Sequence, residues 1–202
     1  MMMKLILFIF GGLFSACNNE PTQENILLEV KHQSLHEEAR IFVEENEFND
    51  SYYFLLDFSI HSGKNRFFIY DFESSSITKS ALVTHGSCDV FESNPTAHEK
   101  AKFSNQVNSH CSSLGKYKIG KRDYSSWGIN VKYWIHGLES TNNKAVERVV
   151  VLHSWSAVAD EEIHPRFAPL SWGCPTVSDN FMKHLDDLLK QSTKPVLLWI
   201  VE

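Results

Sequence analysis

The sequence carries a histidine and a cysteine in settings that suit nucleophilic catalysis. His153 ends an apolar run, Val149–Leu152, that is typical of a buried strand. Cys174 follows Gly173 in a turn of small residues, where glycine accepts backbone angles that push the neighbouring thiol outward. A histidine within hydrogen-bond reach of this thiol would remove its proton and leave a nucleophilic thiolate. Cys174 is therefore a candidate nucleophile, and His153 a candidate general base and later acid, since histidine titrates near neutral pH. The alternatives are a disulfide-bonded Cys174 and a His153 that merely ends a core strand.

The residues around Cys174 limit which groups can stabilise negative charge on an attacked carbonyl. Pro175 has no N–H, so the residue after the nucleophile cannot donate a hydrogen bond. The amides of Cys174, Gly173 and Trp172 are left as candidates for an oxyanion hole. Ser171 is interpreted as shaping the turn, because it lies three residues from the better nucleophile.

The pair His153-Ser154, followed by Ser171-x-Gly173-Cys174, resembles the signature of murein L,D-transpeptidases with a YkuD-like catalytic domain. Matching pieces extend over residues 51–201. The resemblance implies a mainly β, mixed α+β fold: an L,D-transpeptidase-like β-sandwich or barrel with a few peripheral helices. It also implies acyl transfer on peptidoglycan stem peptides through a cysteine thioester, with the backbone carbonyl of Ser154 orienting His153. No cofactor and no metal are expected.

The chain departs from the family pattern in ways that bear on substrate choice. Pro175-Thr176 stands where many members carry valine and arginine, and Ser154 replaces a common glycine. Leu170 stands where the family members that this chain most resembles often have arginine. Arg166 is therefore a candidate for binding a stem carboxylate. An exposed Arg166 without a role is an equal alternative.

Substrate-binding candidates also include aromatic residues. Four tryptophans could line a glycan groove, although such residues more often belong to a core: Trp127, Trp134, Trp155 and Trp172. We expect the long segment 154–170 to act as a lid, with Trp155 and Trp172 flanking the entrance. Ser171 is counted with this substrate-binding set.

The N-terminus has the features of a bacterial lipoprotein signal. Lys4 precedes an apolar core, Leu5–Phe14, which is too short to cross a membrane, where roughly 20 apolar residues are needed. Ser15-Ala16 before Cys17 resembles a lipobox, which implies cleavage before Cys17 and lipidation of its thiol. An ordinary signal peptide with an incidental cysteine is the alternative.

These features divide the chain into three parts. Residues 1–16 are interpreted as the signal peptide, residues 17–33 as the lipidated cysteine with a polar tether, and residues 34–202 as the L,D-transpeptidase-like domain. The protein would then be lipid-anchored in the bacterial cell envelope and face the periplasm. An L,D-carboxypeptidase using the same site, and a non-catalytic wall-binding lipoprotein, are the alternative functions.

Two further cysteines allow more than one interpretation. Apart from Cys17 and Cys174, the chain contains Cys88 and Cys111, and an oxidising compartment favours a disulfide between them. Because His85 and His110 lie nearby in the sequence, a zinc site is an alternative, as is a pair of free thiols.

The composition is that of an ordinary globular protein. The chain has 202 residues, 43% hydrophobic and 22% charged, which suits one domain with a sizeable core. Its net charge of −6 gives no basic surface, so nucleic acid is excluded as an expected partner. The patterns predict strands at 53–60, 66–72, 77–85 and 196–201, a helix at 35–45 capped by Ser34, and a helix after Ser178.

Overall fold

The structure is a computed structural model that describes residues 23–89, 98 and 100–202. The predicted signal peptide and the lipidation site at Cys17 lie outside the described residues. The chain forms two compact units, residues 1–35 and 36–202, and helix α1 (Gln23–Glu45) contributes to both. None of the described helices is both long enough and apolar enough to cross a membrane.

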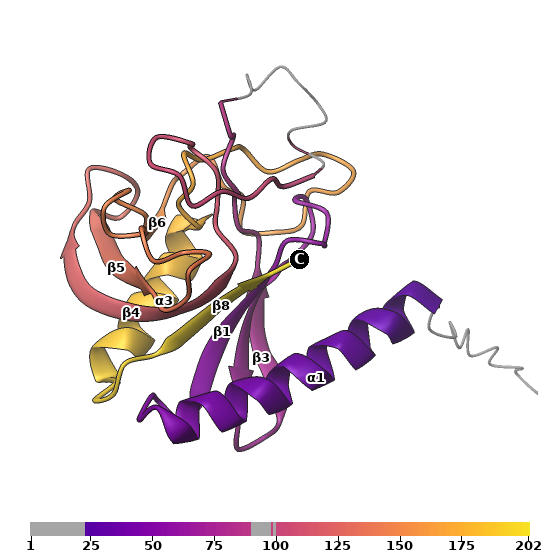
Figure 1. The fold of residues 1–202 in the computed structure, drawn as a ribbon. Coiled ribbons are helices and arrows are strands. Elements are labelled where there is room, and N and C mark those ends of the chain that lie inside the picture. The colour runs from indigo at the N-terminus through magenta and orange to yellow at the C-terminus, as the bar shows by residue number, and fades with distance from the viewer. Residues whose placement is uncertain (1–22, 90–97, 99) are drawn as a thin grey trace, which may run out of the picture. The chain divides into compact units, whose positions relative to one another are not determined.

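The 36–202 unit is mainly β, as expected, and its strands form one mixed sheet (Figure 1). The sheet order is β3-β2-β1-β8-β4-β5-β6-β7, and the pairs β1–β8 and β6–β7 are parallel whereas the others are antiparallel. The strands of the described chain are β1 Tyr52–Asp57, β2 Phe67–Asp71, β3 Ser76–Ala81, β4 Gly115–Tyr124, β5 Val131–Gly137, β6 Val151–Ser154, β7 Thr176–Val177 and β8 Leu197–Val201.

Strand β1 is buried on both faces because each face is covered by a helix. Phe54 belongs to the main core, in which Phe181 of α3 (Asp179–Gln191) packs edge-on against Phe67 with ring centroids 5.1 Å apart. On the opposite face, the Nδ1 atom of His36 in α1 lies 2.6 Å from the Tyr53 hydroxyl, and the two groups form a hydrogen bond. The nearly continuous apolar run of β1 follows from this double coverage.

The two helices differ in how well the sequence predicts them. Ser178 caps α3, because its hydroxyl accepts a hydrogen bond from the Phe181 amide at 3.2 Å, as predicted. The predicted start of the first helix is wrong: α1 begins at Gln23, so Ser34 lies inside the helix and residues 23–33 are helical. This stretch is rich in Glu, Leu, Gln and Lys, which are good helix formers and extend the helix past the apparent cap.

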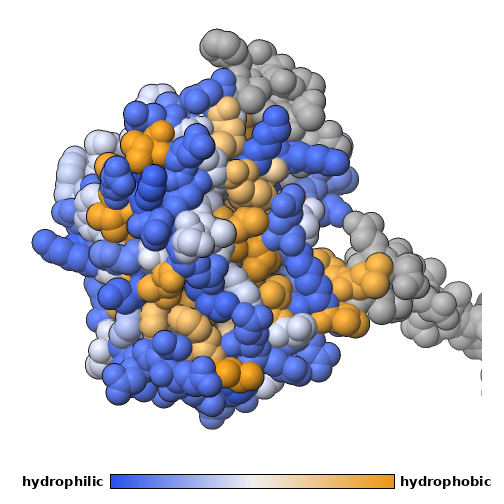
Figure 2. All heavy atoms as spheres, viewed as in Figure 1, coloured by the Kyte–Doolittle hydropathy of each residue, from blue (hydrophilic) through white to orange (hydrophobic). Residues whose placement is uncertain are grey.

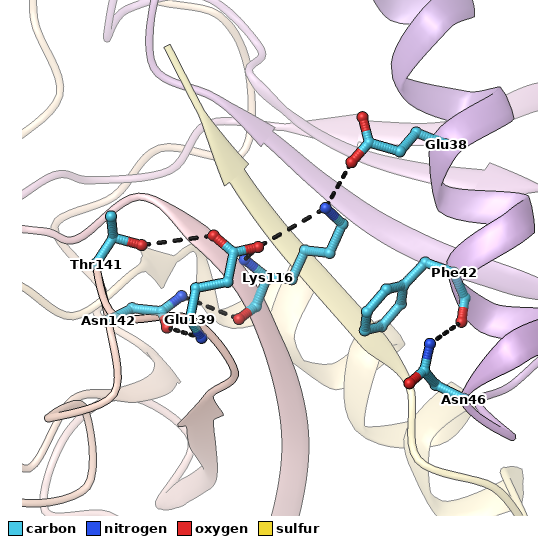
Figure 3. Close-up of polar contacts among 7 residues, drawn as sticks. All are labelled: Glu38, Phe42, Asn46, Lys116, Glu139, Thr141 and Asn142. Carbon is cyan, nitrogen blue, oxygen red and sulfur yellow. Dashed lines mark hydrogen bonds and ion pairs between the residues drawn. The ribbon is translucent and has the colours of Figure 1, made fainter.

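Lys116 of β4 joins the second half of α1 to the loop that leads toward the site (Figure 3). Its ammonium lies 2.7 Å from the Glu38 carboxylate and 3.7 Å from that of Glu139. The buried Asn142 side chain donates to the Lys116 carbonyl at 2.9 Å and accepts from the Glu139 amide. These contacts fix the loop between β5 and β6, which positions the start of β6.

The surface of the described residues is mostly polar. Figure 2 shows hydrophilic residues over most of the viewed face, with hydrophobic residues in smaller groups among them. Several large aromatic side chains are nevertheless exposed, including Trp127 and Trp172.

Candidate active site

Strand β6 brings the predicted nucleophile and base together. His153 lies directly opposite Thr176 in the parallel β6–β7 pair, and Cys174 lies two residues before the start of β7. The Val151 amide donates a hydrogen bond to Cys174 Sγ at 3.4 Å, and the thiol donates to the Val149 carbonyl at 3.8 Å. The sulfur is therefore held beside the start of β6, two residues along the strand from His153.

The hydrogen bonds of His153 determine which ring nitrogen is the base. Its Nδ1 lies 3.0 Å from the Ser154 carbonyl, which can only accept, so Nδ1 carries the proton. In the neutral ring, Nε2 then carries the lone pair, and the Thr176 hydroxyl donates to it at 3.1 Å. Among the described residues, no hydrogen bond joins Nε2 to Cys174.

The surroundings of Cys174 and His153 favour the neutral form of both groups. Burial lowers the pKa of His153 below its ordinary value, although the hydrogen bond to Ser154 acts in the opposite direction and the Lys132 charge lowers it further. Burial raises the pKa of the Cys174 thiol, opposed by the Val151 amide and by the charges of Arg148 and Lys132. Both shifts favour the protonated thiol of Cys174 and the neutral imidazole of His153.

Hydroxyl groups fix the turn that carries the nucleophile. The Cys174 carbonyl lies within hydrogen-bond distance of the hydroxyls of Ser171, Thr84 and Thr176, at 2.7, 3.2 and 3.3 Å. Ser171 also accepts a hydrogen bond from the Gly173 amide at 3.2 Å, as suits its predicted role in shaping the turn. Gly173 has φ +101°, a conformation that favours glycine.

The amides around Cys174 differ in availability. The Gly173 amide is bound by Ser171, whereas the amides of Trp172 and Cys174 have no hydrogen-bond partner among the described residues. Of the three oxyanion candidates, these two are therefore open to a substrate.

Val149 has an unusual backbone conformation beside the thiol. It is β-branched, yet its φ is +56°, and it occupies the position after a helical turn that glycine usually fills. Its amide donates to the Val146 carbonyl at 3.0 Å, and the Val150 amide donates to the Ala145 carbonyl at 2.9 Å. A conformation of this kind costs about 1–3 kcal/mol, and here it places the Val149 carbonyl next to Cys174.

Arg148 is a site residue that sequence reasoning did not assign to the site. Its guanidinium donates to the Ser113 hydroxyl and to the Cys111 carbonyl, and it lies 3.4 Å from the position that a side chain at Gly173 would occupy. It thus links the loop around Cys111 to the nucleophile's turn. The partners are distant in sequence, so only the position of Arg148 just before β6 gave a signal.

A disulfide joins Cys88 and Cys111 in the structure. Their sulfurs are bonded to each other and are not thiolate ligands for a metal. The disulfide connects the segment after Gly86 to the loop that supports the nucleophile's turn, since the Ser112 hydroxyl donates to the Gly173 carbonyl at 3.3 Å.

The two tryptophans proposed for substrate binding occupy different surroundings. The Trp172 side chain is 76% exposed and stacks on His110 with ring centroids 5.0 Å apart. His110 in turn forms a 2.5 Å ion pair with Asp89. Trp155, directly after Ser154, packs edge-on against Trp127 at 5.8 Å.

Arg166 lies on an exposed part of the segment 154–170. This segment is tied to the turn after β1: the amides of Ile163 and His164 both donate to the Gly63 carbonyl, at 2.8 and 3.0 Å, and the Ala168 amide donates to the Ser62 hydroxyl. The Arg166 side chain makes no hydrogen bond or ion pair with a described residue. The structure therefore brings Cys174, His153, Ser154 and Ser171 together but places no contact between Arg166 and them.

The comparison with protein families identifies the family of the chain. A family model described as the L,D-transpeptidase catalytic domain matches residues 24–198. The chain belongs to this family. No curated protein matches the chain.

Several solved structures are similar to this L,D-transpeptidase family member at low sequence identity. They are the helical cell shape determining protein Pgp2 from Campylobacter jejuni (10% identity, TM-score 0.45, 74% of this chain and 47% of that one), Bd1075 from Bdellovibrio bacteriovorus (14%, 0.45, 76% and 49%) and an L,D-transpeptidase from Xylanimonas cellulosilytica (12%, 0.41, 74% and 60%). The chain spans about half to three-fifths of their lengths.

Proposed function

We propose that the protein is a peptidoglycan L,D-transpeptidase that transfers the acyl group of a stem peptide through a thioester on Cys174. The observation that carries this proposal is the fixed tautomer of His153. Because Ser154 accepts the Nδ1 proton, the basic lone pair on Nε2 faces Thr176 of β7, two residues after Cys174.

Acylation starts from the neutral pair. Cys174 Sγ leaves the Val149 carbonyl and attacks the carbonyl carbon of the third stem residue, while its proton moves to Nε2 of His153. The developing oxyanion accepts hydrogen bonds from the amides of Cys174 and Trp172. The carbon–nitrogen bond then breaks, His153 returns the proton to the leaving nitrogen, and the terminal D-alanine departs.

Deacylation reverses the proton movements. An amine of a second stem attacks the thioester, His153 accepts a proton from that amine, and the Cys174 thiol is released with the proton. Trp172 and Trp155 are proposed to contact substrate, and Arg166 is a candidate for a stem carboxylate that approaches from the 154–170 segment.

Intact-mass analysis of the protein after incubation with a donor tetrapeptide tests the acylation step. The wild type is expected to gain the mass of the tripeptide acyl group, and Cys174→Ser is expected to gain nothing while keeping its melting temperature. An adduct on the serine variant would remove Cys174 from the mechanism.

Product analysis then identifies the reaction. With acceptor stems present, cross-linked dimers are expected together with tripeptide. Tripeptide alone at every acceptor concentration would make the protein an L,D-carboxypeptidase, and absence of any adduct would favour the non-catalytic wall-binding alternative.

We also propose that the domain is held at the cell envelope, on the periplasmic side, by a lipid on Cys17. Support comes from the apolar N-terminal segment followed by Ser15-Ala16-Cys17. Labelling of cells with an alkyne-tagged fatty acid should mark the wild type and not Cys17→Ser. Equal labelling of both proteins would contradict the anchor.

A further inference from the structure

A row of polar side chains crosses four adjacent strands at the site. In the strand register Asp123 of β4 lies opposite Lys132 of β5, Lys132 lies opposite His153 of β6, and His153 lies opposite Thr176 of β7. Directly opposite residues place their Cβ atoms about 4.5–5.5 Å apart on one face of a sheet. Lys132 is therefore the immediate neighbour of the catalytic base, on the side away from Thr176.

The alternation of β5 directs Lys132 away from the core. Val131, Tyr133 and Ile135 are buried, whereas Lys132 and Trp134 are half-buried on the opposite face. The Lys132 ammonium lies 4.9 Å from the centre of the Trp134 ring, which supports its side chain.

The hydrogen bonds from Trp134 and Tyr124 lower the pKa of Asp123 most, and the charge of Lys132 lowers it further without a close ion pair. Both oxygens of Asp123 are engaged by other donors, one by the Tyr124 amide at 2.8 Å and one by Trp134 Nε1 at 3.0 Å. No carboxylate of a described residue lies within 4.0 Å of the Lys132 ammonium. Lys116, in contrast, is paired with two carboxylates. The influence of Lys132 on the pKa of both His153 and Cys174 agrees with an ammonium that acts on the catalytic pair.

The chemistry of the leaving group indicates what this cation would bind. His153 returns its proton to the nitrogen of the departing residue. If that residue is the last of the peptide, its carboxylate is only two bonds from the same nitrogen. We propose that Lys132 binds this terminal carboxylate and so restricts the enzyme to stem peptides whose scissile bond is the last one. The inference rests on the proposed function and names the substrate feature that its site selects.

The same contact would also select the amine that attacks the thioester. A free amino acid that attacks the thioester must place its amine at His153, which brings its own carboxylate to Lys132. Amino acids are therefore expected to be better acceptors than their carboxamides.

A pair of alkylating reagents tests the carboxylate site without any peptide. Iodoacetate and iodoacetamide react with the same thiol, and they differ in that only the first carries a carboxylate. The rate constants for Cys174 are measured in the full chain by mass spectrometry, with Cys174→Ser as the blank for any other thiol. Changes in thiol reactivity affect both reagents alike, so the ratio of the two rates reports the carboxylate contact.

Lys132→Met should lower the iodoacetate-to-iodoacetamide ratio by about three- to fivefold, a typical size for a partly exposed ion pair. Lys132→Arg should keep most of the ratio. Lys118→Met is the matched control, since it removes an exposed cation opposite His136, about 13 Å along β5 from Lys132. A ratio unchanged by Lys132→Met, or lowered equally by Lys118→Met, would overturn the proposal.

A tetrapeptide and its C-terminal carboxamide extend the test to the reaction. The wild type should favour the free acid, and Lys132→Met should raise KM for the acid toward that for the amide with a smaller change in kcat. An undiminished preference in Lys132→Met would overturn the assignment. If neither peptide acylates the wild-type enzyme, the proposed function fails. The alkylation ratio still decides whether Lys132 binds a carboxylate.

Discussion

Replacement of Thr176 by valine tests the hydrogen-bond arrangement of the base. Valine has nearly the same shape as threonine, so the change removes the hydroxyl group 3.1 Å from His153 Nε2 and leaves the strand pairing in place. The Cys174 carbonyl keeps its hydrogen bonds to Ser171 and Thr84. The variant therefore removes one hydroxyl group that contacts both the imidazole and, at 3.3 Å, the Cys174 carbonyl.

The hydroxyl binds both protonation states of His153, but it does not bind them equally. It donates to neutral Nε2 and accepts from Nε2–H of the imidazolium. Hydrogen bonds to charged groups contribute about 1.5–3 kcal/mol, against about 0.5–1.5 kcal/mol for neutral pairs. Loss of the hydroxyl should thus destabilise the imidazolium by about 1 kcal/mol more than the neutral ring, which lowers the proton affinity of His153 about fivefold.

The sign of the pH effect follows from this difference. The base must be neutral, so kcat/KM falls as the pH drops through the pKa of His153 in the free enzyme, which burial already sets below its ordinary value. In Thr176→Val the pKa should be lower still, and the acidic fall should move to lower pH. Thr176→Ser should behave as the wild type.

NMR of labelled histidine measures the same quantity without a substrate. The signal of His153 is assigned by its loss in His153→Gln and followed through a pH titration. A pKa of His153 that rises in Thr176→Val would mean that the hydroxyl stabilises mainly the neutral ring, and the reasoning above would be refuted.

Three further changes probe the groups around the pair. Because burial raises the pKa of the Cys174 thiol, its alkylation by iodoacetamide should climb only through the alkaline range; a plateau of fast reaction extending below pH 7 would instead reveal a thiolate–imidazolium pair. Gly128→Ala should lower the free energy of unfolding by about 2 kcal/mol in urea titrations and slow thioester formation, since Gly128 has φ +56° and the added methyl group would overlap the Ser154 oxygens. Replacement of Cys88 and Cys111 by alanine should cost about 3 kcal/mol of unfolding free energy, from the 23-residue separation that the disulfide closes; an unchanged denaturation midpoint would contradict this.

The helices and strands that the sequence predicts are those whose hydrophobic pattern is visible within their own residues. The apolar runs of β1, β2 and β8 and the amphipathic face of α3 are local patterns. Strand β4 was not predicted, because its ten residues include several charged side chains on a strand that is half exposed. The alternation of Val131, Tyr133 and Ile135 would have indicated β5.

The site residues divide in the same way: some are recognisable from neighbouring residues in the sequence, and others only from contacts between distant strands. His153 and Cys174 are recognisable because nucleophilic chemistry needs their side chains and a sharp turn. Thr84 reaches the Cys174 carbonyl from the segment after β3, and Lys132 reaches His153 through the register of β5 and β6. Such contacts depend on which strands become neighbours, which a single sequence does not specify. Thr176 appeared only as a departure from the family pattern, with no sign that it would contact the base.

In the structure, Cys174 and His153 each form their hydrogen bonds with other groups and not with each other. The thiol is bound by the main chain at Val149 and Val151, and Nε2 of His153 is bound by Thr176. Oxidation of cysteine follows its thiolate character, so a neutral thiol resists oxidants that would modify a permanent thiolate. This matters for a protein that, as we propose, works outside the cytoplasm. We propose that a substrate carbonyl binds at the Cys174 and Trp172 amides, where the sulfur attacks it as its proton moves to His153.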